Sequence, residues 1–468
     1  MPAQTKTKEF SIRALAQITA AEPCGQSAGS FTGVSIDSRT IEPGDCFFAV
    51  SGENFDGHDY VEDAFRKGAA CAVVQRDLPA GCRRDSKLLK VDDTVKALGD
   101  FARWYRTQAD FQVVAVTGSV GKTTTRRIIH HVLSRNFRVC QAPKNFNNHI
   151  GLPLTLLKAD CEDEIVVVEI GANRRGEIGY LTRIALPDIA VITSVRPVHL
   201  AGFGDVKTIA REKLSIAEGL RPGGSLLINT DCQILIDTAR ATGLGFACFG
   251  MSSASPPSMD HVTDISCAGH SSSFTLNGVR IFLPLPGAGN VENALAAWAV
   301  CSRFGISVND YADALRSVTA PPMRAELLQF ANITVLNDCY NANPASMKNA
   351  LDTLVGLRLA RQQPNGRLVF VCGHMAELGR QSRQLHVELG RQIAEAGVRL
   401  LLAVGQLGQV AANSAAAAAN LETILFHDAG GVCDNLKHLI RQDDIILVKG
   451  SRAAALETVV EKLKELFA

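Results

Sequence analysis

Short apolar runs alternate with segments of helical spacing through the centre of the chain. Apolar runs bounded by turn residues are typical of strands that are buried on both faces of a parallel sheet. Helix-period segments between them imply right-handed crossovers, and hence a mostly parallel α/β sheet. We expect strands at 113–116, 165–170, 189–195 and 225–228.

The alternation restarts after Pro321-Pro322, which we interpret as a domain boundary. Beyond it, most of the apolar runs are again followed by a helical pattern. This order predicts a second doubly wound, Rossmann-like sheet. Its strands are expected at 333–336, 368–371, 400–404, 423–426 and 445–448.

The first part of the chain has shorter strands at 34–39, 46–50 and 70–74, with a helix-like stretch at 60–67. At about 150 residues per domain, 468 residues suggest three domains. We therefore predict an α/β protein with a small α/β N-terminal domain (1–110), a central parallel-sheet domain (111–319) and a C-terminal Rossmann-like domain (320–468). Within the central domain, Asn277-Gly278 predicts a hairpin at 274–282, ahead of a helix at 290–304.

Composition excludes several classes of protein. The net charge is +1, from 48 Lys and Arg against 47 Asp and Glu, which argues against a protein that holds nucleic acid by bulk charge. The sequence contains no run of 18 apolar residues, so we expect no membrane-spanning helix. The polar start lacks the apolar core of a signal peptide. The thirteen scattered cysteines contain no Cys-x-x-Cys pair, so we interpret them as reduced thiols of a cytoplasmic protein.

The sharpest signal is a glycine-bearing turn between an apolar strand and a helix, at Gly118-Ser-Val-Gly-Lys-Thr123. Backbone N–H groups of such a P-loop can surround a phosphate, while Lys122 reaches the β- and γ-phosphates and Thr123 supplies a hydroxyl for Mg²⁺. Val116 stands where the general pattern has its first glycine. We predict an ATP site that includes Gly118, Ser119, Gly121, Lys122, Thr123 and Thr124.

Further polar side chains follow other central strands. Glu169 ends the strand at 165–170, where a carboxylate can hold Mg²⁺, although a solvated glutamate remains the alternative. His199 follows the next strand and is either a ligand or a structural loop histidine. The amides of Asn145, Asn147 and Asn148 suit a polar substrate, with a plain loop as the alternative.

The C-terminal domain carries two polar segments at predicted strand ends. The first, Asn337 to Met347, contains Asp338, Asn341, Asn343 and Ser346, of which Asn343 and Ser346 could instead cap a helix. The second, Leu447 to Arg452, ends the last strand with two cations and a glycine. This segment could hold a phosphate or carboxylate, or provide surface charge.

These segments together resemble the Mur ligase family over nearly the whole chain. The matching motifs are Ser35-Ile-Asp-Ser-Arg39, Thr117-Gly-Ser-Val-Gly-Lys-Thr123, Asn145-Phe-Asn-Asn148 with Ile150-Gly151, Glu169-Ile-Gly-Ala-Asn173, His199-Leu-Ala-Gly-Phe-Gly204, Asn290-Val-Glu-Asn-Ala-Leu295, Tyr340-Asn-Ala-Asn-Pro344, Met375-Ala-Glu-Leu-Gly379 and Val448-Lys-Gly-Ser-Arg452. The Tyr340 and Met375 segments resemble the branch that adds D-alanyl-D-alanine to UDP-N-acetylmuramoyl-tripeptide in peptidoglycan synthesis. The resemblance implies an ATP-dependent carbon–nitrogen ligase that works through an acyl phosphate.

The resemblance also implies roles for individual residues. It puts Ser38 and Arg39 near the UDP-sugar. Catalytic and metal-site roles fall to Lys122, Thr123, Glu169, His199 and Lys213, the last as a lysine carbamylated by CO₂. Asn290 and Asn293 would lie near adenine, Arg324 and Asp338 would reach ATP, and substrates would contact Asn145, Asn147, Asn148, Asn341, Asn343 and Ser346.

Four positions depart from the family's usual residues, namely Ala201 for an acid, Ser215 for Glu, Met323 for Gly and His374 for Asp. The implied cofactors are ATP and Mg²⁺, and the implied substrates are UDP-N-acetylmuramoyl-tripeptide and D-alanyl-D-alanine. We expect no nucleic-acid partner. We expect a monomer. The alternatives are another Mur-type or folylpolyglutamate amino-acid ligase, and a P-loop ATP-binding switch without catalysis.

Overall fold

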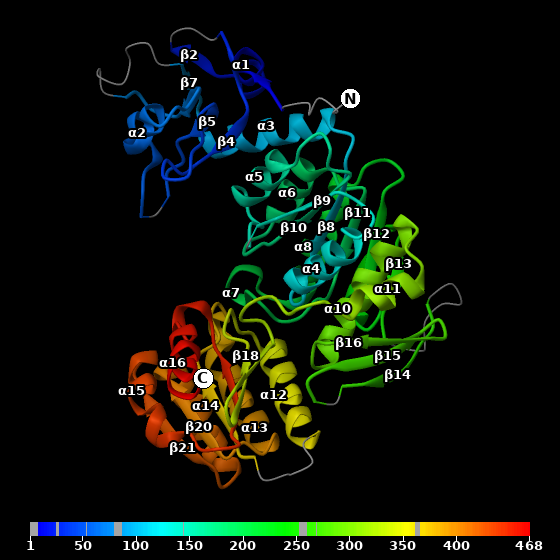
Figure 1. Ribbon diagram of the computed structural model, residues 1–468, viewed down its shortest axis with the longest axis vertical. Helices are drawn as coiled ribbons and strands as arrows, with labels where there is room; N and C mark the ends of the chain where they lie inside the picture. The colour runs from blue at the N-terminus through cyan, green and yellow to red at the C-terminus, as the bar shows by residue number, and fades with distance from the viewer. Residues whose placement is uncertain are drawn as a thin grey trace.

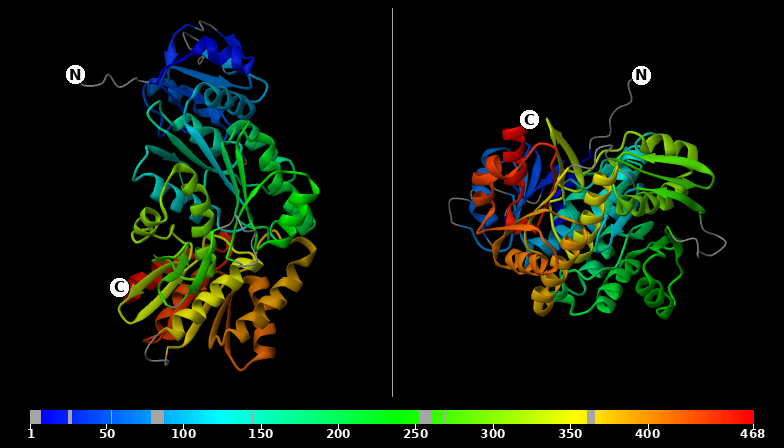
Figure 2. Two further views of the ribbon diagram at one scale, coloured as in Figure 1. Left: turned by 90° about the vertical axis from the view of Figure 1, so that its right-hand side faces the viewer. Right: turned by 90° about the horizontal axis from the view of Figure 1, so that it is seen from below.

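The helices and strands form three groups along the longest axis of the molecule (Figures 1 and 2). In this computed structural model, residues 8–24, 28–52, 54–78, 87–143, 145–251, 260–267, 269–360 and 366–468 are described. The N-terminal group lies at one end, the C-terminal group at the other, and the central sheet between them. Within the described residues, no helix is long and apolar enough to cross a membrane.

The N-terminal group is built on a five-stranded sheet of order β2-β7-β6-β5-β4, parallel except at β2. Its strands are β2 (Glu22–Cys24), β4 (Gly33–Ser35), β5 (Asp45–Phe48), β6 (Cys71–Val74) and β7 (Leu88–Lys90), with β1 (Phe10–Ser11) and β3 (Ser30–Phe31) paired separately. Its helices are α1 (Ile12–Thr19), η1 (Gly57–Tyr60), α2 (Val61–Arg66) and α3 (Thr94–Gln108). Helix α3 packs against the central group, which joins the two.

The central group has a fully parallel six-stranded sheet of order β13-β12-β11-β8-β10-β9. The four predicted strands are confirmed as β8 (Gln112–Thr117), β10 (Ile165–Glu169), β11 (Ile189–Ile192) and β12 (Ser225–Asn229), while β9 (Val139–Gln141) and β13 (Ala247–Phe249) were not predicted. The predicted hairpin is confirmed as β15 (Ser272–Leu276) and β16 (Val279–Leu283), which form a small antiparallel sheet with β14 (Val262–Ser266).

Helices cover both faces of the central sheet, so its apolar strands are buried from both sides. One face carries α5 (Gly151–Lys158), α6 (Glu177–Ala185), α8 (Val206–Leu214) and α9 (Gln233–Ala241). The other carries α4 (Lys122–Leu133), α10 (Ala288–Cys301) and α11 (Val308–Leu315). The remaining turns are α7 (Leu200–Phe203), η3 (Ser215–Gly219) and η4 (Ser302–Phe304).

The C-terminal group is the predicted Rossmann-like sheet, with order β17-β18-β22-β19-β20-β21. The predicted strands are confirmed as β18 (Ile333–Asn337), β19 (Leu368–Cys372), β20 (Leu400–Val404), β21 (Glu422–Phe426) and β22 (Ile445–Lys449). An antiparallel edge strand, β17 (Glu326–Phe330), was not predicted. Its intermediate burial leaves no continuous apolar run for sequence analysis to detect.

The last strand inserts between the first two parallel strands, and this sends helices to both faces. One face is covered by α12 (Pro344–Leu359), α13 (Ser382–Glu395) and α14 (Gly405–Ala418). The other is covered by α15 (Ala429–Leu439) and α16 (Glu457–Phe467), and the short turns are η5 (Gly379–Gln381) and η6 (Arg452–Ala454). In such sheets a ligand crevice opens where neighbouring strands lead to opposite faces.

Candidate active site between the central and C-terminal sheets

The phosphate loop connects β8 to α4 through two glycines with positive φ. Gly118 has φ +148°, and a Cβ there would lie 2.0 Å from Thr193 Oγ1. Gly121 has φ +90° at the N-cap of α4, and a Cβ there would meet Asn293 Oδ1 at 2.1 Å. Only glycine fits both positions. Val116 is a buried strand residue, so the turn begins at Gly118 and the missing first glycine leaves the loop intact.

The first residues of α4 contact the carboxylate at the end of the neighbouring strand. The Thr123 hydroxyl donates to Glu169 Oε2 at 2.8 Å, and Asn147 Nδ2 donates to Oε1 at 3.0 Å. Burial alone raises the pKa of Glu169, but the positive charges of Lys122 and Arg324 and the Asn147 hydrogen bond outweigh it, so the pKa is lowered. Glu169 is therefore an anion at neutral pH.

Lys122 is held within the loop, where its Nζ donates to the Gly118 carbonyl at 2.9 Å. Burial lowers the pKa of Lys122, while the negative charge of Glu169 opposes this and Arg324 adds to it. Two cations from different sheets therefore lie close to one carboxylate, an arrangement suited to a strongly anionic ligand.

The hydroxyl of Thr123 and the carboxylate of Glu169 provide the hard oxygen donors that Mg²⁺ prefers, at the mouth of a phosphate loop. The donor set therefore fits this ion. Within the described ranges, no group of three or more His, Cys, Asp or Glu side chains could hold a metal on its own. A metal here would rely on the hydroxyl, the Glu169 carboxylate and groups that the ligand brings.

His199 lies where the central and C-terminal groups touch. It has a left-handed backbone (φ +49°), and its Nδ1 contacts Glu377 Oε2. The Ala201 N–H also donates to the Glu377 carbonyl at 3.1 Å, and Gly379 packs against Ala201. The small residue at 201 thus leaves room for the C-terminal group. Burial lowers the pKa of His199, although Glu377 opposes this.

Lys213 projects from α8 toward the same space and is 2% exposed. Burial, followed by the positive charge of Lys122, lowers its pKa from 10.5 to about 7. The neighbouring Glu212 instead accepts the Gly176 and Ile178 N–H groups at the start of α6. The neutral amine is therefore far more accessible near neutral pH than in an ordinary lysine.

The C-terminal residues at the site are fixed by one another. Lys449 Nζ lies 2.5 Å from Asp338 Oδ2 and donates to the Asn341 carbonyl at 3.0 Å. Arg324 stacks over the Tyr340 ring, with 4.0 Å between its Cζ and the ring centroid. Asn343 and Ser346 form a capping box at the start of α12, which confirms the predicted helix-capping role. Both residues also line the cavity.

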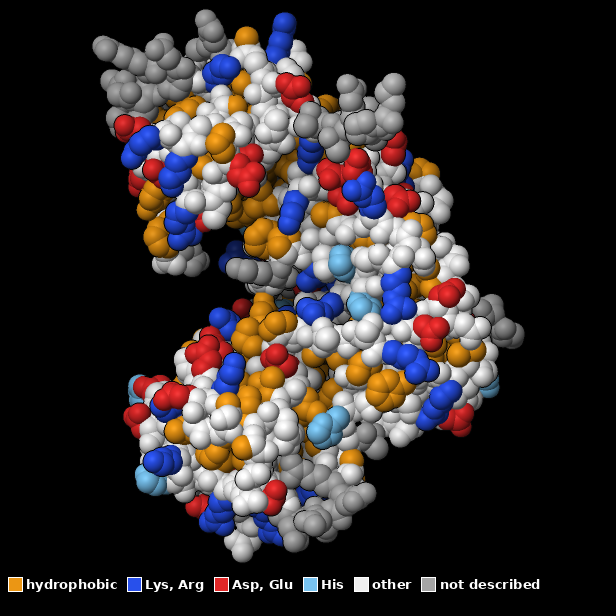
Figure 3. All heavy atoms as spheres, in the orientation of Figure 1, with side chains coloured by type: hydrophobic (Ala, Val, Ile, Leu, Met, Phe, Trp, Pro, Cys, Tyr) orange, Lys and Arg blue, Asp and Glu red, His pale blue; other side chains and the backbone are white. Residues whose placement is uncertain are grey.

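These residues surround one cavity of about 690 Å³ between the two groups. The space-filling view shows the surface notched between the N-terminal and C-terminal lobes (Figure 3). Of the predicted site residues, the cavity wall contains Gly118, Ser119, Gly121, Lys122, Thr123, Thr124, Asn145, Asn147, Asn148, Glu169, His199, Lys213, Asn290, Asn293, Arg324, Asp338, Asn341, Asn343 and Ser346. Ser38 and Arg39 lie outside it, with Ser38 buried and Arg39 exposed and paired with Asp37.

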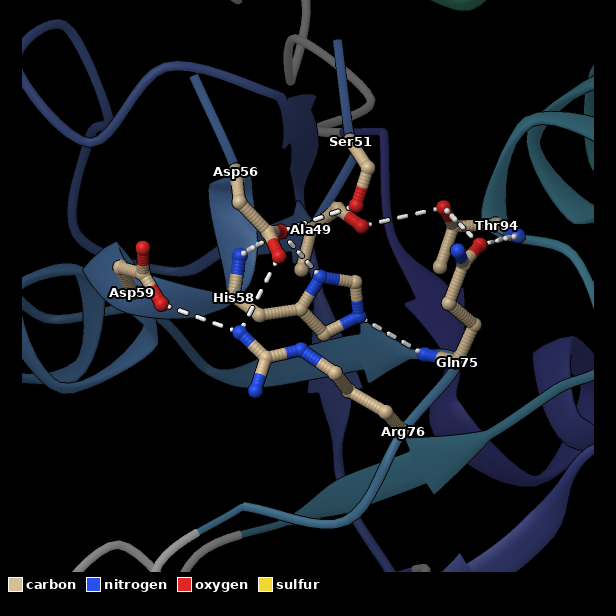
Figure 4. Close-up of polar contacts among 8 residues, drawn as sticks. All are labelled: Ala49, Ser51, Asp56, His58, Asp59, Gln75, Arg76 and Thr94. Atoms are coloured by element: carbon tan, nitrogen blue, oxygen red, sulfur yellow. Dashed lines mark hydrogen bonds and ion pairs between the residues drawn. The ribbon is translucent and has the colours of Figure 1, made fainter.

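A polar network at the carboxyl ends of β5 and β6 was not predicted (Figure 4). The buried His58 ring lies between Asp56, 2.6 Å from Nδ1, and the Gln75 N–H, which donates to Nε2 at 3.0 Å. Arg76 bridges Asp56 and Asp59. The network holds the loop after β5 against the sheet, and its only signal in the sequence is the cluster of short polar residues at 51–59.

The fold and site define a P-loop ATP-binding protein whose phosphate loop faces a second α/β sheet across a shared polar cavity. Comparison with family profiles finds the Mur ligase middle domain at residues 116–301, the Mur ligase glutamate ligase domain at 323–452 and the Mur ligase family catalytic domain at 30–106. The chain belongs to the Mur ligase family.

Individual relatives agree with this assignment. The chain is 35% identical over 438 residues to the UDP-N-acetylmuramoyl-tripeptide–D-alanyl-D-alanine ligase of Bacillus subtilis, covering 92% of this chain and 93% of the relative. Its structure is similar to that of MurF from Acinetobacter baumannii, with a TM-score of 0.87, 30% identity and coverage of 98% and 99%. It also resembles MurF ligase from Thermotoga maritima in complex with ADP, with a TM-score of 0.80, 26% identity and coverage of 93% and 97%.

Proposed function

We propose that this protein is an ATP-dependent ligase that joins D-alanyl-D-alanine to UDP-N-acetylmuramoyl-tripeptide in peptidoglycan synthesis. The observation that carries the proposal is that the phosphate loop and the Asn341–Ser346 segment line the same cavity. Relatives at 35% identity over more than nine-tenths of their length bear this activity in their names.

The chemistry begins with activation of the tripeptide carboxylate, because an amine cannot displace oxide from a carboxylate. Lys122 and the loop N–H groups bind the ATP phosphates and neutralise the charge that gathers on the transferred phosphoryl group. Arg324 and Asp338 approach ATP from the C-terminal domain, while Asn290 and Asn293 lie near adenine. The product is an acyl phosphate, which the amine of D-alanyl-D-alanine then attacks with loss of phosphate.

Thr123, Glu169 and His199 are the residues that would hold Mg²⁺. Bound there, the ion would supply positive charge between the phosphates and the reacting carboxylate. Lys213 supports this site in a further way, since a neutral amine is the form that reacts with CO₂. Its pKa of about 7 favours carbamylation, which would replace a cation by an anion beside Lys122.

Substrate contacts are divided among three domains, for which we retain the bounds 1–110, 111–319 and 320–468. Ser38 and Arg39 bind the UDP-sugar outside the cavity. The amides of Asn145 and Asn148 face the tripeptide, and Asn147 acts mainly on Glu169. Asn341, Asn343 and Ser346 contact the dipeptide. We propose a cytoplasmic location, since the UDP-linked substrate and ATP are cytoplasmic metabolites. We also propose that the protein is a monomer.

The decisive experiment measures phosphate release from ATP by the purified protein. Release should require both UDP-N-acetylmuramoyl-tripeptide and D-alanyl-D-alanine. Equal release without the dipeptide would contradict the ligase, and ligation of a free amino acid in its place would favour another Mur-type or folylpolyglutamate ligase. ATP binding without any ligation would favour the switch. Lys122→Ala should abolish turnover, and normal turnover in that variant would refute the assigned role.

A further inference from the structure

Two strand-end loops of the C-terminal sheet meet beside the cavity. Strands β19 and β22 are parallel neighbours, with Cys372 opposite Lys449. Each is followed by a glycine, and a Cβ on Gly373 would lie 3.1 Å from the Cα of Gly450. The loops approach this closely because both residues lack a side chain.

The next residue of each loop forms a serine–histidine pair. Ser451 Oγ lies 3.0 Å from His374 Nε2, and the Ser451 N–H donates to the His374 carbonyl at 2.9 Å. Ser451 occupies the N-cap position of η6, yet its hydroxyl makes no capping hydrogen bond. The hydroxyl is thus used for the histidine, and helix capping does not explain it.

The pair connects the cavity with solvent. Ser451 is 1% exposed and forms part of the cavity wall, whereas His374 lies behind it and keeps part of its surface exposed. The chain leaves β19 toward α13 on one face of the sheet and β22 toward α16 on the other. The pair therefore lies at a crevice between strands that lead to opposite faces, where ligands of such sheets bind.

The proposed ligation requires the attacking amine in the cavity to lose protons. The amine of the dipeptide is an ammonium ion at neutral pH and must lose protons before and during attack on the acyl phosphate. Resting on that proposed function, we propose that Ser451 and His374 form a proton relay that deprotonates the attacking amine.

The atoms balance as follows. The ammonium ion loses its first proton to solvent before the attack. As the new C–N bond forms, a second N–H proton moves to Ser451 Oγ, and the proton of the Ser451 hydroxyl moves to His374 Nε2. The C–O bond of the acyl phosphate breaks, and its electrons leave with phosphate. Ser451 is regenerated, and the imidazolium of His374 returns its proton to solvent.

The residues around His374 leave its ring able to accept a proton from Ser451. Burial lowers the pKa of His374, so the ring is neutral at pH 7. The neighbouring His386 accepts the Met375 N–H at Nε2 and donates from Nδ1 to the Ser382 carbonyl, which fixes it as a neutral ring. On the Ser451 side the cations are paired, Lys449 with Asp338 and Arg452 with Glu457.

The test compares two substitutions of His374 that differ in proton affinity. His374→Asn can still accept a hydrogen bond from Ser451 but cannot take its proton, so kcat with D-alanyl-D-alanine should fall about 100-fold or more while KM changes little. His374→Asp restores a proton acceptor and should recover kcat, with the acidic limb of the pH profile moved to lower pH. His427→Asn, at a fully exposed histidine, is the matched control and should behave as wild type.

Hydroxylamine separates this proposal from the ligase itself. It is neutral near pH 7 and attacks an acyl phosphate without help from a proton acceptor. Wild type and His374→Asn should therefore form hydroxamate from ATP and UDP-N-acetylmuramoyl-tripeptide at similar rates. If wild type forms neither hydroxamate nor dipeptide product, the ligase and the relay both fall. If wild type forms both hydroxamate and the dipeptide product, the ligase stands and the relay can be tested alone. An unchanged kcat and pH profile in His374→Asn would overturn the relay. So would a loss of hydroxamate formation in His374→Asn as large as its loss of dipeptide ligation.

Discussion

The buried ion pair between Lys449 and Asp338 gives the most quantitative prediction. Lys449 is 1% exposed, and its Nζ contacts the Asp338 carboxylate and the Asn341 carbonyl. Lys449→Met keeps the length of the side chain and leaves that carboxylate without its cation. Removing one partner of a buried pair costs about 3–5 kcal/mol. Because Asp338 is 18% exposed and still accepts the Ala325 N–H, we expect about 3 kcal/mol.

The assay is amide hydrogen exchange of the full chain, which reports the opening of each sheet separately. Exchange in peptides that cover β18 and β22 should accelerate about 100-fold, since 1.4 kcal/mol is a factor of ten. Lys348→Met is the matched control. It removes the same charge from an exposed pair with Asp352, 60% and 62% exposed, whose worth is below about 1 kcal/mol.

Two results would refute this reasoning. The first is equal exchange in β18 and β22 for Lys449→Met and Lys348→Met, which would mean that burial does not strengthen the pair. The second is a further loss of exchange protection in β18 and β22 when Asp338→Asn is added to Lys449→Met. Removing the stranded charge should recover part of the protection, because the cost lies in the uncompensated carboxylate.

Three further predictions concern the site. Gly121→Ala should weaken ATP binding about 10-fold or more in calorimetry, because φ is +90° and the new Cβ meets Asn293 Oδ1, whereas Gly245→Ala, with open space around it, should bind normally. At fixed dissolved CO₂, the initial rate of carbamate formation at Lys213, followed by ¹³C NMR, should be about tenfold lower at pH 6 than at pH 8. The amine takes up a proton as the pH falls through about 7, and equal rates would contradict its lowered pKa. Thr123→Val should raise the Mg²⁺ concentration needed for half-maximal turnover while metal-free nucleotide affinity stays unchanged; an unaltered Mg²⁺ requirement would exclude the hydroxyl as a ligand.

Much of the fold follows from local pattern. The buried strands β8, β10, β18, β19, β20 and β22 carry apolar runs because both faces of their sheets are covered. The hairpin at Asn277-Gly278 follows from two residues that tolerate positive φ, here +49° and +83°. Among the strands that were not predicted, β9, β13 and β17 lie at sheet edges and are only partly buried, so they carry no continuous apolar run.

The candidate site divides in the same way. The phosphate loop is local, since strand, glycines and helix start are consecutive and their chemistry can be read from spacing. The family resemblance supplied roles for Lys213 and Arg324, whose surroundings no local pattern describes. The pairs His199–Glu377 and Ser451–His374 join residues 178 and 77 positions apart, and nothing in either segment alone indicates its partner.

The sequence by itself determined the three α/β groups, the P-loop and the polar strand ends, because each depends on residues within one turn or strand. Only the tertiary structure decided which of these ends face each other. The insertion of β22 between β18 and β19 places Lys449 against Asp338 and Ser451 against His374, and the packing of the C-terminal group on α7 closes one cavity over the phosphate loop. Charge, burial and pKa at the site arise from those long-range contacts, because a side chain's electrostatic environment is set by its neighbours in space.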